Sequence, residues 1–186
     1  AFYAWCGAIN KDPQLLFEAE LDSKSIVIDA GAYTGDWAKE IIDRYHPTIH
    51  AFEPDPRNFS RLEKKAQTEP GLKPHKYGLG DRDELARITL EYLGSTLYSG
   101  NRPTTDTPTA EAEIRDIAST WRALELRTVD LMKINIEGAE FPLLEQMIKT
   151  ELLSNVDCYL IQFHEWHPRA YQRRRHIRRE LSKTHE

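Results

Sequence analysis

Two apolar patterns alternate along the chain. Runs of β-branched and aromatic residues predict strands, whereas apolar residues three or four positions apart predict helices. The predicted strands cover residues 25–29, 48–53, 72–77, 87–92, 129–136 and 156–163. The predicted helices run from Asp36 until Pro47, from Pro56 through Ala66, along the apolar stripe from Ile114 to Leu124, onward from about Glu140, and from Tyr171 to Leu181. This alternation predicts an α/β fold with a mostly parallel, doubly wound sheet that helices cover on both faces.

The length of 186 residues suits one globular domain. We divide it into an N-terminal helical extension (1–24), a core (25–168) and a basic C-terminal helix (169–186). Residues 94–109 are rich in Gly, Ser, Thr and Pro, which predicts a long loop able to close over a site. No apolar run approaches the roughly 20 residues of a membrane-spanning helix, so we predict no transmembrane segment.

Charge is distributed unevenly, with 25 Lys and Arg against 30 Asp and Glu and a net charge of -5. Seven of the basic residues lie within 169–183. An acidic body with one basic helix argues against a surface that wraps nucleic acid. The arginines at 173–179 favour a solvated helix face, and the alternative is a patch that attracts an anionic acceptor. The two cysteines, Cys6 and Cys158, exclude a disulfide scaffold and favour a cytoplasmic location.

The end of the first predicted strand carries the most informative motif, Asp29-Ala30-Gly31-Ala32-Tyr33-Thr34-Gly35. A dinucleotide-binding turn would have glycine at the position of Asp29, where a carboxylate would repel a pyrophosphate. That carboxylate suits a cationic ligand such as a sulfonium, and Gly31 lets the backbone pass close to it. Glu53 ends the next strand, from which an acid can accept hydrogen bonds from ribose hydroxyls. The combination predicts S-adenosylmethionine as cofactor.

Three blocks of sequence fall at predicted strand ends. They are residues 26–35, residues 51–56 and residues 131–140, the last reading Leu-Met-Lys-Ile-Asn-Ile-Glu-Gly-Ala-Glu. In this order they resemble the FkbM-type S-adenosylmethionine-dependent methyltransferases, over roughly residues 25–168. The resemblance implies a Rossmann-like class I methyltransferase fold and O-methylation, often of a sugar or polyketide hydroxyl. Ile-Gln-Phe-His at 161–164 is similar to a branch of the family associated with glycan genes.

Two features depart from the family pattern. Asn135 stands where many members have Asp, which removes a possible base or ligand. Members of the glycan-associated branch also continue beyond the segment that matches 182–186, into a further strand region. We therefore expect that a C-terminal hairpin is missing and that one edge of the sheet is exposed.

The candidate site residues follow from these motifs. The predicted cofactor-binding residues are Asp29, Gly31, Ala32, Tyr33, Gly35, Glu53, Asp81 and Asn135. Asp81 would hold the adenine amino group, although it would equally suit an ordinary turn. The segment from Gly94 to Tyr98 could close over the cofactor or the acceptor.

Removal of a proton from the acceptor hydroxyl calls for a general base. Glu137 and His164 are the candidates, and His164 is preferred because its unperturbed pKa lies near neutral pH. The structural alternatives are a strand-to-helix turn for Glu137 and a hydrogen-bonded core histidine for His164. A metal site made of both residues with His167 matches no standard zinc motif, so we predict no metal.

Three functions therefore compete. The first is an S-adenosylmethionine-dependent O-methyltransferase acting on a glycan or similar hydroxylated metabolite. The second is a binding module that holds the cofactor without catalysis, which Asn135 makes credible. The third is an oxidoreductase with a nicotinamide cofactor, against which Asp29 and the missing glycines count.

Overall fold

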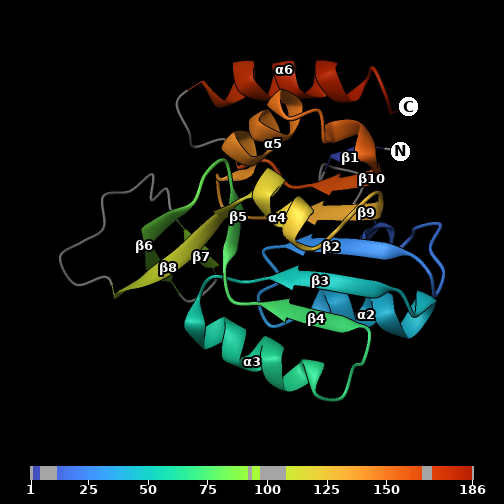
Figure 1. Ribbon diagram of the computed structural model, residues 1–186, viewed down its shortest axis with the longest axis vertical. Coiled ribbons are helices and arrows are strands. Elements are labelled where there is room, and N and C mark those ends of the chain that lie inside the picture. The colour runs from blue at the N-terminus through green and yellow to red at the C-terminus, as the bar shows by residue number, and fades with distance from the viewer. Residues whose placement is uncertain (1, 5–11, 92–93, 97–107, 165–168, 186) are drawn as a thin grey trace.

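The computed structural model describes residues 2–4, 12–91, 94–96, 108–164 and 169–185 (Figure 1). Its larger sheet has six strands in the order β1-β10-β9-β2-β3-β4, and every neighbouring pair is parallel. These strands are β1 (Phe2–Ala4), β2 (Ile26–Ala30), β3 (Thr48–Phe52), β4 (Leu72–His75), β9 (Val129–Ile134) and β10 (Val156–Ile161). The predicted parallel α/β fold is confirmed.

A smaller sheet lies beside the carboxyl ends of the larger one (Figure 1). Its order is β5-β8-β6-β7, with one parallel pair and two antiparallel pairs. The strands are β5 (Gly78–Gly80), β6 (Glu84–Glu91), β7 (Gly94–Thr96) and β8 (Thr109–Asp116). This second sheet forms one wall of the site described below.

Helices cover both faces of the larger sheet. On one face, Ile28, Met132 and Ile134 pack with apolar residues of α4 (Ile117–Ala123), α5 (Glu140–Lys149) and α6 (Ala170–Leu181). On the other face, the partners of the alternate strand residues are α2 (Asp36–Tyr45) and α3 (Pro56–Ala66). Since successive side chains of a strand point to opposite faces, each central strand contributes to both cores.

The strand order reverses beside β2. The chain proceeds from β2 to β3 and β4 on one side, whereas β9 and β10 lie on the other side. Such a switch point leaves a crevice outside the carboxyl ends of the strands, because successive connections diverge there. The topology thus places any ligand between the ends of β2, β3 and β9.

Several predicted elements differ in the structure. The expected helical extension over 1–24 contains, in its described residues, strand β1 and a short 3-10 helix, Pro13–Leu16. The stripe beginning at Ile114 is not all helix, because alternate residues of 109–116 are buried in β8 before α4 begins. The predicted loop over 94–109 begins with β7, and the remaining expected lid residues, 97–107, lie outside the described part of the chain.

The edge of the sheet beside β10 also differs from the expectation. Strand β1 pairs with β10 in parallel along Tyr159–Ile161, with Tyr3 opposite Leu160, so this half of the β10 edge is covered. The N-terminal segment thus lies beside β10, a position that its place in the sequence did not predict. Among the described helices, none is long and apolar enough to cross a membrane.

Candidate functional site

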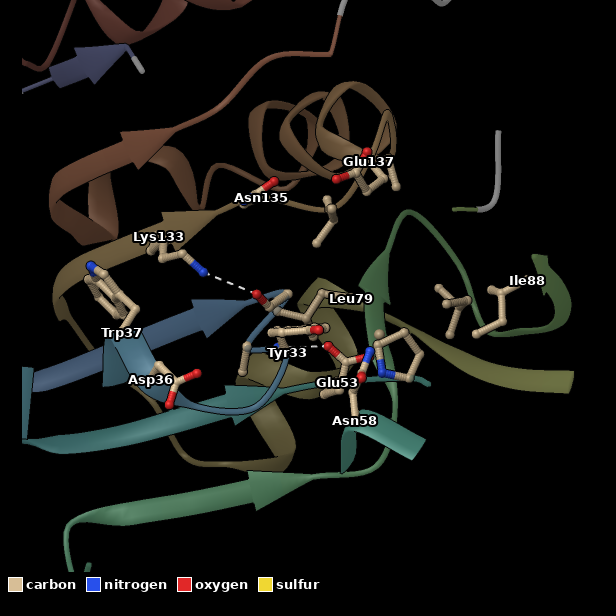
Figure 2. Close-up of a pocket in the computed structure, with 17 residues that line it drawn as sticks. Tyr33, Asp36, Trp37, Glu53, Asn58, Leu79, Ile88, Lys133, Asn135 and Glu137 are labelled. Atoms are coloured by element: carbon tan, nitrogen blue, oxygen red, sulfur yellow. Dashed lines mark hydrogen bonds between the residues drawn. The ribbon is translucent and has the colours of Figure 1, made fainter. Parts of the chain in front are cut away.

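A cavity of about 320 Å³ lies at the switch point of the larger sheet (Figure 2). It opens between the turns that follow β2, β3 and β9, and the smaller sheet closes its far side. The residues that line it are Gly31, Ala32, Tyr33, Asp36, Trp37, Glu53, Pro54, Asn58, Gly78, Leu79, Ile88, Ile114, Lys133, Asn135, Ile136, Glu137 and Ala139.

The turn after β2 forms the floor of the cavity. Gly31 has φ of 81°, and a Cβ atom at this position would lie 2.0 Å from the carbonyl oxygen of Asn135. Only glycine permits both this conformation and this approach of two strands. Tyr33 also adopts a left-handed conformation, with φ of 53°. Gly35 lies outside the cavity, where it caps α2 and packs against Leu62.

A buried ion pair lies beneath this turn. The Nζ atom of Lys133 is 2.7 Å from Oδ1 of Asp29 and also donates to the carbonyl oxygen of Gly31 at 3.0 Å. The Asp29 and Lys133 side chains are 0% and 6% exposed. Asp29 therefore does not present its charge to a ligand directly, as the sequence suggested. The charge that reaches the cavity wall is the ammonium of Lys133.

Two buried oxygen atoms next to this pair have no hydrogen-bond partner among the described residues. They are Oδ2 of Asp29 and Oδ1 of Asn135. Asn135 follows Lys133 by two positions on the same side of the chain, and its backbone N–H donates to the carbonyl oxygen of Ala30. A buried acceptor without a donor is costly, and of these two residues only Asn135 lines the cavity.

Glu53 ends β3 in a different environment. Its two carboxylate oxygens accept hydrogen bonds from the backbone N–H groups of Tyr33 and Asp55, each at 2.8 Å. Burial nevertheless raises the pKa of Glu53 to about 7, since the two hydrogen bonds only partly offset the loss of water and the charges of Asp55 and Asp29 raise it further. The side chain lines the cavity and can still accept hydrogen bonds there.

The opposite end of the cavity is mostly apolar. Pro54, Leu79, Ile88 and Ile114 line it from the β3 end and the smaller sheet, and Asn58 adds one amide group. Figure 2 shows Lys133 and Trp37 at one end of the labelled group and Asn58 and Ile88 toward the other. Ile88 of the smaller sheet thus lies at the end of the cavity away from Lys133.

The turn after β9 carries a second polar cluster. Glu140 is fully buried and accepts hydrogen bonds from the backbone N–H groups of Ile136 and Gly138, at 3.0 and 2.9 Å. His164 Nδ1 lies 2.7 Å from Glu140 Oε1, and His164 Nε2 lies 3.6 Å from Glu137 Oε2. Glu137, with φ of 53°, lines the cavity, whereas His164 does not.

The electrostatics of His164 follow from these neighbours. Burial by itself would lower the pKa of His164. The hydrogen bond and charge of Glu140, together with the charge of Glu137, outweigh burial and raise the pKa. Both ring nitrogens face carboxylates, so the imidazole is better placed to hold Glu137 than to take a proton from an acceptor.

The structure brings together six of the ten predicted site residues. Those that line the cavity are Gly31, Ala32, Tyr33, Glu53, Asn135 and Glu137. Asp29 and His164 lie one layer behind it. Asp81 follows β5 but does not line the cavity, and its carboxylate pairs with Arg82 at 3.2 Å. Its assignment to adenine stays a prediction without support from the geometry.

Sequence reasoning missed three residues. Lys133 was visible as a charge within the apolar strand 129–136, and such a charge must find a partner. Glu140 fits an ordinary acid at the start of a helix, yet its carboxylate accepts hydrogen bonds from the backbone of the turn before α5. Trp37 lies in the first turn of α2, and its ring, whose centroid is 5.4 Å from Lys133 Nζ, lines the cavity.

No group of three or more His, Cys, Asp and Glu side chains in the described part of the chain is arranged to hold a metal ion. His167, which belonged to the alternative metal site, lies outside the described residues. His164 interacts with the carboxylates of Glu137 and Glu140.

Comparisons with known proteins found similar chains among curated proteins and among solved structures. Methyltransferase 1 of Beauveria bassiana (strain ARSEF 2860) is 27% identical over 148 residues, which cover 68% of this chain and 59% of that protein. The chain thus spans little more than half of that relative. Among solved structures, a precorrin-6y C5,15-methyltransferase from Geobacter metallireducens GS-15 has a TM-score of 0.40 at 11% identity, covering 72% of this chain and 52% of its own.

A shorter match is the 23S rRNA methyltransferase ErmE, with a TM-score of 0.31 and 25% identity over 36% of this chain and 27% of its own. The family model described as "Methyltransferase FkbM domain" matches residues 29–185, which is most of the chain. The match includes the ends of β2, β3 and β9 that build the cavity. The chain belongs to the FkbM methyltransferase family.

Proposed function

We propose that this protein is an S-adenosylmethionine-dependent O-methyltransferase that methylates a hydroxyl group of a sugar, a glycan or a similar metabolite. The observation that carries the proposal is the cavity at the switch point, where the Gly31 turn and the Glu53 carboxylate face the same space. Membership of a methyltransferase family supports the reaction class. The Ile-Gln-Phe-His motif at 161–164, which resembles the glycan-associated branch of the family, supports the acceptor class.

The residues of the cavity fit an adenosine-containing sulfonium compound. Glu53 can accept hydrogen bonds from the two ribose hydroxyls, and the apolar end around Leu79 suits a purine ring. Oδ1 of Asn135 is a buried acceptor without a donor, which suits an ammonium group. The described residues that line the cavity form no glycine-rich anion cradle, so a pyrophosphate fits it less well.

Catalysis would depend mainly on alignment and on one base. When bound, S-adenosylmethionine supplies a methyl group on a positively charged sulfur. The Gly31 turn and Glu53 would fix the adenosine, which contributes to catalysis through orientation. Glu137, whose side chain is 28% exposed at the cavity, would accept the proton of the acceptor hydroxyl.

His164 and Glu140 would then position this base. Glu140 fixes the backbone of the turn through Ile136 and Gly138, and it holds the imidazole through Nδ1. The other ring nitrogen places a donor beside the Glu137 carboxylate. We therefore reverse the order of preference drawn from sequence, with Glu137 as the base and His164 as the residue that orients it.

The experiment has a binding arm and a turnover arm. Calorimetric titration of the full chain with S-adenosylmethionine and S-adenosylhomocysteine should give micromolar affinity, and Glu53→Ala should weaken it. Transfer of labelled methyl groups should then be screened over neutral and anionic sugars. Absence of binding by a folded sample would refute the cofactor. Binding without transfer to any hydroxyl would instead support a binding module.

Once an acceptor is found, Glu137→Gln tests the base. We expect kcat to fall at least about 100-fold while the affinity for S-adenosylhomocysteine changes less than about threefold. His164→Asn should lower kcat less than Glu137→Gln and shift the pH profile of kcat. A Glu137→Gln variant with full turnover would disprove this role.

A further inference from the structure

The outer face of α6 carries a concentration of positive charge that the proposed methyl transfer does not use. Residues 169–186 contain seven Lys and Arg against two Glu, although the whole chain has a net charge of -5. The rest of the chain is therefore acidic, and the positive charge of this segment is gathered on one helix and its flanks. Figure 1 shows α6 at the outer end of the molecule, beyond α5.

The packing of α6 fixes which of its sides faces outward. Ala170, Ile177 and Leu181 are buried in the core that α5 shares. Arg173 also turns toward α5, where its guanidinium pairs with Glu145 at 2.6 Å. The opposite side of the helix is therefore held toward solvent.

This exposed side carries a row of cations, which consists of Arg175, Arg178, Arg179 and Lys183. Arg175 and Arg178 form no ion pair within the described ranges, and Glu180 is the partner of both Arg179 and Lys183. Arg175 precedes Arg179 by four positions, as Arg179 precedes Lys183, and like charges at this spacing destabilise a helix. The helix dipole offsets part of this repulsion in the last turn. A negatively charged partner would screen what is left.

We infer that this row docks the protein on an anionic phospholipid bilayer, with α6 lying flat on the headgroups. The helix has 12 residues and is about 18 Å long, and its convex surface allows a flat charged plane to meet the whole row. Guanidinium groups form paired hydrogen bonds with phosphate oxygens. Clustered cations are attracted to the negative surface of a membrane without any segment that crosses it.

An exposed aromatic side chain favours a bilayer over a soluble polyanion. Tyr171 is 67% exposed. It precedes Arg175 by four positions and Arg178 by seven, so the three side chains share one face of the helix. Tyrosine suits the membrane–water interface, because its ring is apolar and its hydroxyl is polar. An acidic polysaccharide offers partners for the arginines but no apolar layer for the ring, and the acidic remainder of the chain disfavours nucleic acid.

Co-sedimentation of the full chain with lipid vesicles tests this docking. Vesicles of equal parts phosphatidylcholine and phosphatidylglycerol should bind the protein, and phosphatidylcholine alone should bind it at least about 10-fold more weakly. Salt at about 1 M, where the Debye length is about 3 Å, should release the protein. The outer face of α6 shares no residue with the cavity, so this result is independent of the proposed function.

Substitution of the row should remove the binding. Arg175→Gln/Arg178→Gln/Arg179→Gln should weaken binding to the mixed vesicles about 100-fold, since each cation near the surface contributes about fivefold. The matched control, Lys24→Gln/Arg61→Gln/Lys64→Gln, removes the same charge from exposed positions outside α6 and should change the affinity less than about threefold. Circular dichroism checks that both variants are folded.

A soluble polyanion separates the bilayer from other anionic partners. Tyr171→Ser should weaken binding to the mixed vesicles while leaving any binding to polygalacturonate unchanged. Equal losses in the two triple variants, or tighter binding of the wild type to polygalacturonate or duplex DNA than to the mixed vesicles, would overturn the inference. If the arginine variant does not fold, equal binding of the wild type to the two kinds of vesicle would overturn it as well.

Discussion

Two carboxylates end neighbouring strands at the same cavity, yet their surroundings differ. Asp29 at the end of β2 is held by the ammonium of Lys133, 2.7 Å away. Glu53, just beyond β3, is held by two backbone N–H groups and has a pKa of about 7. Burial raises the pKa of Glu53, and its two backbone donors only partly offset that effect. The two ends of the cavity should therefore respond differently to mutation and to pH.

The largest effect should follow from breaking the ion pair. Lys133→Met should lower the free energy of unfolding at pH 7 by about 3–5 kcal/mol, because it leaves a buried carboxylate without its partner. Asp29→Asn/Lys133→Met should recover most of that loss. Urea unfolding followed by circular dichroism measures both variants. A loss below about 1 kcal/mol for Lys133→Met would show that Asp29 does not need the cation.

The pH dependence of the free energy of unfolding should distinguish the contribution of Glu53 from that of its neighbour His75. The pKa of Glu53 is raised from 4.5 to about 7, so its contribution to stability falls as pH rises through that range. Burial, with the charges of His50 and Arg115, lowers the pKa of His75 from 6.5 to about 4, so its contribution falls as pH drops through that range. The two groups oppose each other between pH 4.5 and 6.5.

Substituting either residue should reveal the pH dependence of stability that the other one contributes. Relative to the wild type, Glu53→Gln should lose about 1–3 kcal/mol of unfolding free energy on going from pH 6.5 to 4.5, while His75→Gln should gain a similar amount. Urea unfolding over this pH range provides the measurement. Parallel pH profiles for the wild type and Glu53→Gln would mean that Glu53 does not titrate in this range.

The affinity for S-adenosylhomocysteine should change with pH because Glu53 ionises. Ionised Glu53 accepts hydrogen bonds from ribose hydroxyls more strongly than the protonated acid. We expect the affinity for S-adenosylhomocysteine to rise by up to about 10-fold from pH 6 to pH 8, and to stay flat in Glu53→Gln. Calorimetry at several pH values tests this. The same slope in both proteins would assign the titration to another group.

The smallest effect is expected at Asp81, a predicted cofactor acid that lies outside the cavity and pairs with Arg82. Asp81→Asn should change the affinity for S-adenosylhomocysteine by less than about twofold, since exposed ion pairs contribute little. A larger loss in calorimetry would add Asp81 to the acids that meet the cofactor.

Much of the fold could be predicted from local patterns. The boundaries of α2 and α3 follow from the apolar spacing that ends before Pro47 and from the cap at Asp55, which accepts from Arg57 N–H. The smaller sheet was less predictable. In β8, an alternating strand runs directly into α4, and the apolar positions of the two elements merged into one apparent helix.

The candidate site could be predicted in part for a similar reason. Gly31, Glu53 and Glu137 lie at strand ends, and parallel strands bring such ends to one edge of a sheet. The roles of Asp29 and His164 could not be deduced, because each depends on a partner distant in sequence. Those partners are Lys133, which is 104 residues from Asp29, and Glu140, which is 24 residues from His164.

The sequence by itself determined five of the six strands of the larger sheet, the glycine turn after β2 and the family to which the chain belongs, because these are local properties of neighbouring residues. Only the tertiary structure decided which charges are exposed to a ligand. Burial and long-range pairing withdraw Asp29 from the cavity and present Lys133 in its place. Local patterns show that a charge must be paired, but the register of β2 and β9 selects its partner.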